Sequence, residues 1–242
     1  MNLSGERRPQ SYLRETLWSD APVSHIVVTP PVPSFPLNPD KADRSVWNFP
    51  DVVDHWNFPG YEGKKMTVSV YSNCEQVELF LNGESLGKQE NTADKKNTLV
   101  WEVPYAHGIL KAVSYNKGGE VGTATLESAG KVEKIRLSAD RTEIVADGND
   151  LSYITLELVD SKGIRNQLAE ELVAFSIEGD ATIEGVGNAN PMSVESFVAN
   201  SRKTWRGSNL LVVRSGKSSG RIIVTATVKA LPVASITITQ KK

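Results

Sequence analysis

Apolar and polar residues alternate along most of this chain with a period of two, the pattern typical of β-strands that bury one face. In the stretch MTVSVYS, the side chains of Met66, Val68 and Val70 share one face, and QVELFL at 76–81 alternates in the same way. The same alternation predicts further strands at 98–103, 109–115, 120–126, 132–138, 151–159, 172–178, 209–215, 220–228 and 234–239. Short strands at this spacing indicate β-sandwiches.

Turn residues separate these strands. Asn82-Gly83 is the kind of dipeptide that most readily takes the left-handed backbone angles of a tight hairpin. Further turn signals are Gly118-Gly119, Asp147-Gly148 and Lys162-Gly163. Ala129-Gly130-Lys131 marks a domain boundary. The pattern therefore predicts an all-β fold with two tandem immunoglobulin-like β-sandwiches, residues 21–130 and 131–242.

One stretch near the start breaks the β pattern. Residues 4–18, SGERRPQSYLRETLW, contain a proline at position 9, where a first helical turn accepts it. The apolar side chains of the expected helix are Leu13, Leu17 and Trp18. A helix of about ten residues is marginal by itself in water. We therefore expect residues 1–20 to form a helical tail whose apolar face folds back onto the first sandwich or stays disordered.

Composition narrows the classes of function. A chain of 242 residues fits about two domains. A net charge of −2 and a pI of about 6.0 argue against a nucleic-acid binder and against an anionic membrane partner. No apolar run approaches the ~20 residues that span a membrane. The one cysteine, Cys74, cannot close a disulfide within the chain, and it is expected to be a small buried apolar residue.

The sequence offers no catalytic constellation. The three histidines, His25, His55 and His107, are scattered and lack metal-ligand spacing. No GxSxG elbow, HExxH helix or phosphate-binding glycine loop is present. The adjacent carboxylates Glu170 and Glu171 are typical of a solvated sandwich rim. We therefore expect no catalytic residue, no metal site and no cofactor in this chain.

Tryptophans in irregular segments are the candidates for ligand contact. Trp47, Trp56 and Trp205 lie outside the predicted strands, whereas Trp101 alternates within one and is expected in the core. Sugar rings stack on indole, so these tryptophans can form a carbohydrate platform. Alternatively, they fill gaps between domains, since each buries up to ~250 Å². The interruption from 187 to 207 is long for an ordered loop, and such loops are often functional.

Several motifs together resemble glycoside hydrolase family 2 enzymes of the β-galactosidase type. The opening stretch resembles the last helix of their catalytic barrel, through Arg8, Pro9, Ser11, Tyr12, Arg14 and Trp18. HWNFPGYEGKKMTVSVYSNCEQVELFLNGESLGK at 55–88 resembles the immunoglobulin-like domain that follows the barrel, and 139–163 resembles the start of an invasin-like module. GNANPMSVESF resembles a family stretch that often reads Gly-Asn-Gly-Asp-Pro, with Asn188 matching and Ala189 and Asn190 departing from it.

This resemblance implies a non-catalytic C-terminal fragment. Family enzymes are retaining glycosidases with two glutamates on barrel strands, and these would lie upstream of Met1, so the chain alone is expected to be inactive. It would support its own missing catalytic barrel, with segments 47–58 and 187–207 approaching the barrel or the substrate. An oligo- or polysaccharide is a second expected partner, and a periplasmic or secreted location is implied. The residues expected to contact substrate are Trp47, Trp56, Trp205 and Asn188.

Two other functions stay open at this stage. A carbohydrate-binding module would use two of the loop tryptophans on one exposed face. An adhesin-like spacer is the third hypothesis, because invasin-like modules often serve that way. The helical opening stretch argues against it, since a spacer has no need of a barrel helix.

Overall fold

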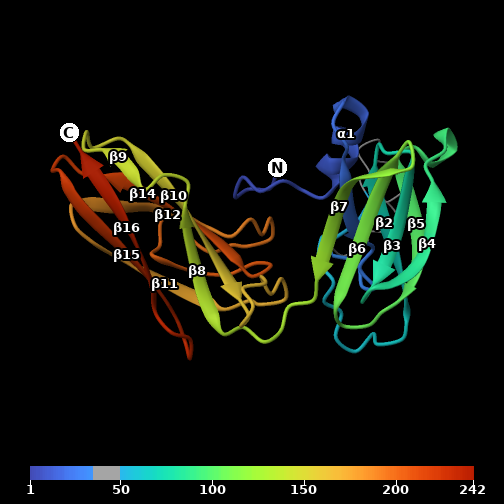
Figure 1. Cartoon of the computed structure of the whole chain (residues 1–242). Coiled ribbons are helices and arrows are strands. Elements are labelled where there is room, and N and C mark those ends of the chain that lie inside the picture. Colours follow the sequence, from blue (N-terminus) through green and yellow to red (C-terminus); the bar gives the residue numbers. More distant parts are fainter. Residues whose placement is uncertain (35–49) are drawn as a thin grey trace. The chain divides into compact units, whose positions relative to one another are not determined.

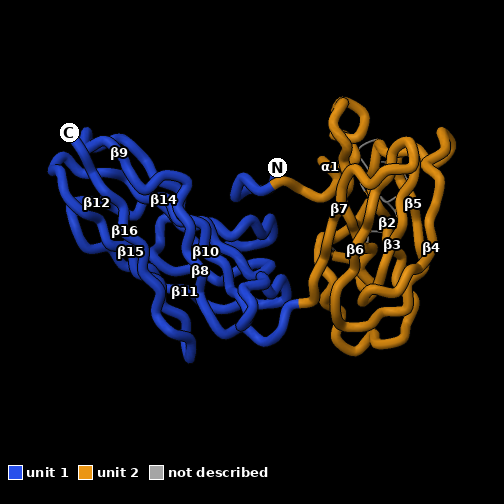
Figure 2. Tube along the Cα trace, in the orientation of Figure 1, with its two compact units in different colours: residues 1–6, 129–242 blue, residues 7–128 orange. Residues whose placement is uncertain are grey.

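The computed structural model describes residues 1–34 and 50–242, which fall into two compact units (Figure 2). Unit 2 holds Arg7–Ser128, and unit 1 holds Met1–Glu6 with Ala129–Lys242. The division at residue 129 falls where the turn signal stands in the sequence. The tail expected over residues 1–20 is not a separate domain, because its first six residues belong to unit 1 and its helix to unit 2.

In its described residues, unit 2 has one α-helix and seven strands, and the strands form two antiparallel sheets (Figure 1). The sheet orders are β1-β2-β5 and β4-β3-β6-β7. The elements are α1 (Gln10–Trp18), β1 (Ser24–Val28), β2 (Lys65–Ser72), β3 (Gln76–Leu81), β4 (Glu84–Glu90), the 3-10 turn η1 (Ala93–Lys95), β5 (Thr98–Pro104), β6 (Ile109–Asn116) and β7 (Gly119–Glu127). At the predicted hairpin between β3 and β4, Asn82 and Gly83 have φ angles of 51° and 87°.

The core of unit 2 lies between these two sheets. The alternating residues Met66, Val68 and Val70 of β2 are all buried in it, together with Trp101 of β5. Three aromatic rings close one part of the core with edge-to-face contacts: Trp56, Phe58 and Tyr105. Cys74 is buried and free, as predicted. One buried face per strand is what the alternation in the sequence required.

Helix α1 packs on unit 2 through a different face from the predicted one. Tyr12 and Leu13 contact the small cluster of Val27, Val52 and Tyr71. Asn97 Nδ2 donates to the hydroxyl of the buried Thr16 over 3.1 Å. Leu17 and Trp18, expected to fold back, are 63% and 85% exposed. These contacts fix the helix rotation, so only Leu13 of the predicted apolar face is covered.

The histidine ring of β1 forms the other half of this contact. Tyr12 stacks on His25 with ring centroids 3.5 Å apart. The Arg7 guanidinium also lies over the Tyr12 ring, 4.0 Å from its centroid. Burial lowers the pKa of His25 from 6.5 to about 4; Arg7 also lowers the pKa, while Asp54 and Glu15 raise it. His25 is therefore neutral in the folded protein at neutral pH.

We expect unit 2 to lose stability as the pH falls from about 6.5 to about 4. Across this window the unfolded chain takes up a proton at His25 that the folded protein resists, so the free energy of unfolding falls by up to about 3 kcal/mol. Urea unfolding at several pH values measures this fall in the free energy of unfolding. His25→Phe is the matched variant, because it keeps an aromatic partner for Tyr12. Identical pH profiles for the two proteins would contradict this assignment.

Unit 1 is a second pair of facing sheets, with orders β12-β14-β10-β8 and β13-β11-β15-β16-β9. All its pairings are antiparallel except β16 with β9. Its strands are β8 (Lys134–Ala139), β9 (Glu143–Val145), β10 (Leu151–Val159), β11 (Leu172–Glu178), β12 (Ala181–Gly187), β13 (Ser201–Lys203), β14 (Ser208–Ser215), β15 (Gly220–Val228) and β16 (Ala234–Lys241). Apolar residues of both sheets form its core, among them Ile154, Leu156, Phe175, Leu211 and Ile222.

The all-β sandwich fold with an N-terminal helix is confirmed. The strands that the alternation did not predict are β1, β4, β9, β12 and β13. Strand β4, ESLGKQE, is an edge strand with mostly exposed side chains, so it has no buried face to leave a period-two signal. Among the described residues, no helix is long and apolar enough to cross a membrane.

Candidate interaction surface

The irregular stretch between β12 and β13, residues 188–200, is the candidate site of unit 1, and we call it the 188–200 loop. Two backbone hydrogen bonds pin it beside the sheets: Val186 N donates to Phe197 O, and Phe175 N donates to Asn200 O, both over 2.8 Å. The loop is therefore an ordered part of unit 1.

A buried arginine organises the interior of this loop. Arg202 is 0% exposed. Its guanidinium donates to Val186 O over 3.3 Å, to Glu195 O over 3.0 Å and to the Ser193 hydroxyl over 3.1 Å. The guanidinium also lies 4.2 Å from the centroid of the Phe197 ring. One side chain thus ties β12 to the middle of the loop, which the fixed fork of a guanidinium suits well.

Glu195 completes this network from the loop side. Its carboxylate accepts from Lys203 N and from the Ser193 hydroxyl, each over 3.0 Å. Its Oε2 lies 4.0 Å from Arg202 Nε, which is too long for a hydrogen bond. Burial raises the pKa of Glu195, but the Lys203 and Ser193 hydrogen bonds and the charges of Arg202 and Lys203 outweigh it, so the pKa is lowered. The carboxylate therefore stays charged at neutral pH.

The loop also exposes several apolar side chains. Val194 is 100% exposed, and the other exposed apolar side chains of the loop are Met192, Phe197 and Val198. Four exposed apolar side chains thus fall on one short ordered loop, and exposed apolar groups gathered in this way often mark interaction surfaces. The arrangement presents apolar groups on a rigid base, which suits contact with another protein surface.

The predicted site residues that the structure describes are divided between the two units. Trp47 lies outside the described residues. Trp56 belongs to unit 2, is 0% exposed and donates its Nε1–H to Ala106 O over 2.8 Å, so neither of its ring faces is open to a sugar. Trp205 belongs to unit 1, where it is half-buried beside the Arg206 guanidinium, 4.6 Å from the ring centroid.

Asn188 lies at the start of the loop, where it holds the backbone. It is buried, its Nδ2 donates to Lys203 O over 2.9 Å, and its Oδ1 accepts from Asn190 N over 3.1 Å. The next residue, Ala189, has a φ of 60°. This left-handed conformation costs an L-residue roughly 1–2 kcal/mol. It accounts for the glycine that often stands here in the family stretch resembled by GNANPMSVESF.

Sequence reasoning did not find Arg202. An isolated arginine in a polar stretch reads as a surface residue, because arginine is almost never fully buried unless it is paired. The available signal was the length of the interruption itself. A 13-residue ordered connection has many backbone groups to satisfy, and a multidentate donor such as arginine can satisfy several of them.

Chemistry that would need a metal has no support in the described residues. Within 1–34 and 50–242, no three side chains of histidine, cysteine, aspartate or glutamate are grouped so that they could hold a metal ion.

Comparison with known proteins identifies the family. A family model described as glycoside hydrolase family 2 C-terminal domain 5 matches residues 135–237, and a domain of unknown function matches residues 63–122. A β-galactosidase of Bacteroides ovatus is 31% identical over 100% of this chain, which spans 25% of that protein. A β-glucuronidase of Formosa agariphila is 30% identical over 75% of this chain, which spans 19% of it.

A solved structure agrees along the full length of the chain. A glycosyl hydrolase family 2 member from Bacteroides cellulosilyticus superposes with a TM-score of 0.98 and 98% sequence identity over 100% of this chain, which covers 31% of that protein. The chain thus spans between 19% and 31% of the length of these relatives. The chain belongs to glycoside hydrolase family 2 and corresponds to its C-terminal region.

Proposed function

We propose that this chain is the non-catalytic C-terminal region of a retaining glycosidase of the β-galactosidase type and that it supports the catalytic barrel of the parent enzyme. The observation that carries this proposal is similarity over the whole chain to a β-galactosidase of which the chain spans 25%. Retaining glycosidases need two carboxyl groups about 5–5.5 Å apart that flank the scissile bond. These groups would stand in the part of the parent that precedes this chain.

The 188–200 loop is the surface we assign to contact with the catalytic part. Its exposed valines, Val194 and Val198, would be expensive to leave in water, since full burial of such a side chain contributes about 1.5–3 kcal/mol. The Arg202 network holds the loop in one conformation before contact, which lowers the entropy lost on association.

Three finer features belong to the same proposal. Both sandwiches are assigned to the immunoglobulin-like class, with two facing, mainly antiparallel sheets as the support. The parent is assigned to the periplasm or the exterior of the cell on the family resemblance. Its sugar specificity would be set outside this chain, because the relatives that this chain matches include both a β-galactosidase and a β-glucuronidase.

The test compares the chain alone with the longer protein that carries it. We expect no hydrolysis of p-nitrophenyl β-galactoside by the chain alone. We expect the double change Val194→Ser and Val198→Ser to lower the free energy of unfolding of the longer protein by about 2 kcal/mol more than that of the chain alone.

Val233→Ser provides the matched control, because this valine of unit 1 is 62% exposed and lies outside the loop. It should have equal and small effects in both proteins, below about 0.5 kcal/mol. Hydrolysis by the chain alone would overturn the non-catalytic assignment. Equal effects of the loop change in the two proteins would overturn the assignment of the loop as a contact.

A further inference from the structure

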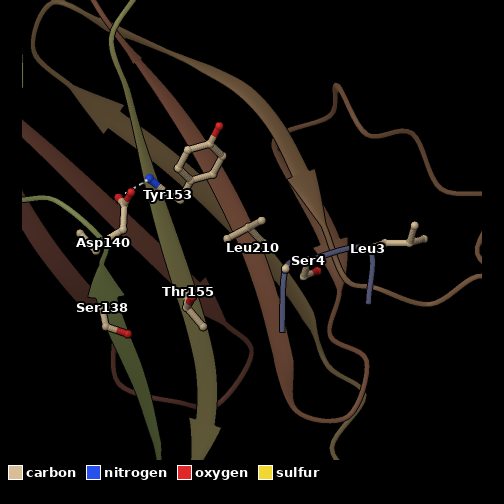
Figure 3. A pocket seen from close by; sticks show the side chains of 9 residues that line it. Leu3, Ser4, Ser138, Asp140, Tyr153, Thr155 and Leu210 are labelled. Carbon is tan, nitrogen blue, oxygen red and sulfur yellow. Dashed lines mark hydrogen bonds between the residues drawn. The ribbon is translucent and has the colours of Figure 1, made fainter. Parts of the chain in front are cut away.

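Unit 1 carries an open groove on the outer face of the β12-β14-β10-β8 sheet (Figure 3). Its volume of about 590 Å³ lies within the usual range for ligand pockets, roughly 300–1,000 Å³. Its lining includes Ser4, Ser138, Asp140, Tyr153, Thr155 and Leu210. The lining shares no residue with the 188–200 loop, and neither Trp56 nor Trp205 belongs to it.

An aromatic ring stands at one side of the groove. Tyr153 of β10 is 41% exposed, and Figure 3 shows its ring projecting from the strand. The backbone that carries the ring is held in place, because the backbone N–H of Tyr153 donates to Asp140 Oδ1 over 2.8 Å. An exposed aromatic ring on a rigid strand is suited to stacking against the C–H face of a sugar.

Hydroxyl groups lie beside this ring. Thr155 and Ser138 are directly opposite each other in the register of β10 and β8. Neither hydroxyl has a hydrogen-bonding partner among the described residues. The Ser4 hydroxyl is buried and also has no partner in the described part of the chain. Hydroxyls both donate and accept, so they match the paired donors and acceptors of a sugar ring.

The N-terminal segment forms the opposite wall, and it is held in place. Asn2 Oδ1 accepts from Ser4 N over 2.9 Å and from Glu6 N over 3.0 Å. Glu6 then pairs with Arg165 at 2.8 Å. Leu3 and Leu210 add apolar surface to the lining. Residues 1–6 thus complete a groove with one aromatic side, apolar walls and a polar floor.

The charges around the groove decide which kind of sugar it suits. Asp140 is the only charged residue of the lining, and the lining contains no lysine or arginine. The arginines nearby in sequence or register already have acidic partners: Arg136 pairs with Glu157, and Arg214 with Glu184. Arg141 pairs with Asp150 at 3.0 Å and with Asp140 of the lining itself at 3.8 Å. A uronate would meet one carboxylate and no free cation, which disfavours it. A neutral sugar can instead donate a hydroxyl to Asp140.

We propose that this groove binds a neutral oligosaccharide, with Tyr153 as the stacking platform. Ser138, Thr155 and Asp140 supply the hydrogen bonds. Unit 1 would thereby hold a glycan chain independently of the catalytic site of a parent enzyme. This inference does not rest on the proposed scaffold function.

The test is calorimetric titration of the 242-residue chain with cellotetraose and β-1,4-galactotetraose as neutral probes. A tetrasaccharide of glucuronic acid is the charged probe. We expect binding of at least one neutral probe and none of the charged probe. Tyr153→Ala should weaken binding at least about tenfold, whereas Tyr153→Phe, which keeps the ring, should stay within about threefold.

Trp18→Ala is the matched control, since Trp18 is an exposed aromatic residue of unit 2. It should leave the affinity unchanged, and the melting temperature of each variant should match that of the unaltered chain. The proposal is overturned if no neutral probe binds at millimolar concentration, if Tyr153→Ala binds as well as the unaltered chain, or if the uronate binds equally well. Because the readout is binding by this chain, its failure leaves the proposed scaffold function standing.

Discussion

Replacing Arg202 with alanine is expected to lower the free energy of unfolding of unit 1 by about 3–4 kcal/mol. The change leaves the carbonyl oxygens of Val186 and Glu195 without their donor and opens a cavity where the guanidinium lay. Each buried acceptor without a partner costs about 1–3 kcal/mol. Urea unfolding followed by hydrogen exchange of unit 1 peptides measures the loss. Peptides of the 188–200 loop should show the largest rise in exchange.

Two companion variants separate the causes. Arg202→Met restores much of the buried volume but not the hydrogen bonds, so we expect a loss of about 2–3 kcal/mol. Lys203→Ala removes an equal charge from the next position, where the side chain is exposed, and should cost below about 0.5 kcal/mol. A loss for Arg202→Ala no greater than that for Lys203→Ala would show that the arginine does not organise the loop.

The strands that bury one face could be predicted from the sequence, because burial of one face leaves an alternating pattern of apolar and polar residues. Strands β3, β10, β11 and β15 lie where the alternation placed them, because each buries every second side chain in a core between two sheets. The turn signals were equally local. Gly148 and Gly163 have φ angles of 82° and 84°, which glycine adopts without steric cost.

What the sequence could not give depends on contacts between distant residues. The sequence predicts that the apolar face of this helix either folds back onto the first sandwich or stays disordered. Instead, the Tyr12–His25 stack and the Asn97–Thr16 hydrogen bond hold the helix so that Leu17 and Trp18 are exposed. Nothing in the local pattern of a nine-residue helix encodes which strand residue it will meet. The same holds for Arg202, whose acceptors lie up to sixteen residues away along the chain.

The candidate surfaces followed the sequence only in part. The long interruption after Gly187 did mark the loop that exposes Val194, although no residue in it indicated how the loop is held. The groove beside Tyr153 was not predicted, because a tyrosine in a regular strand reads as an ordinary β residue. Only the structure shows that Tyr153 lines a groove together with residues of the N-terminal segment 1–6.

Together these surfaces fit a region that acts by contact. In unit 1, the 188–200 loop exposes apolar side chains for which we propose a protein contact, and the groove exposes a ring and hydroxyls for which we propose a glycan. The two sets of residues do not overlap, so substitutions at Val194 and at Tyr153 should affect different measurements. A parent glycosidase would gain both support for its barrel and a second hold on a polymeric substrate.

Replacing Trp56 with alanine is expected to destabilise unit 2 by about 3–5 kcal/mol. The indole is wholly buried, makes edge contacts with Phe58 and Tyr105 at centroid distances of 6.0 and 5.0 Å, and donates to Ala106 O. Its removal leaves a large cavity and a carbonyl without its donor. The loss is measured by urea unfolding followed by hydrogen exchange of peptides from unit 2.

Trp18→Ala deletes an indole from the same unit at a position 85% exposed, and should cost below about 0.5 kcal/mol. Comparing the two variants decides between the two roles that the sequence allowed for tryptophan. A folded Trp56→Ala protein with unchanged stability and reduced glycan binding would restore Trp56 as a sugar platform. Large destabilisation would instead establish Trp56 as a core residue, provided that the glycan affinity is unchanged under conditions where unit 2 is still folded. A ring buried on both faces cannot contact a sugar, so it affects the protein only by stabilising the fold.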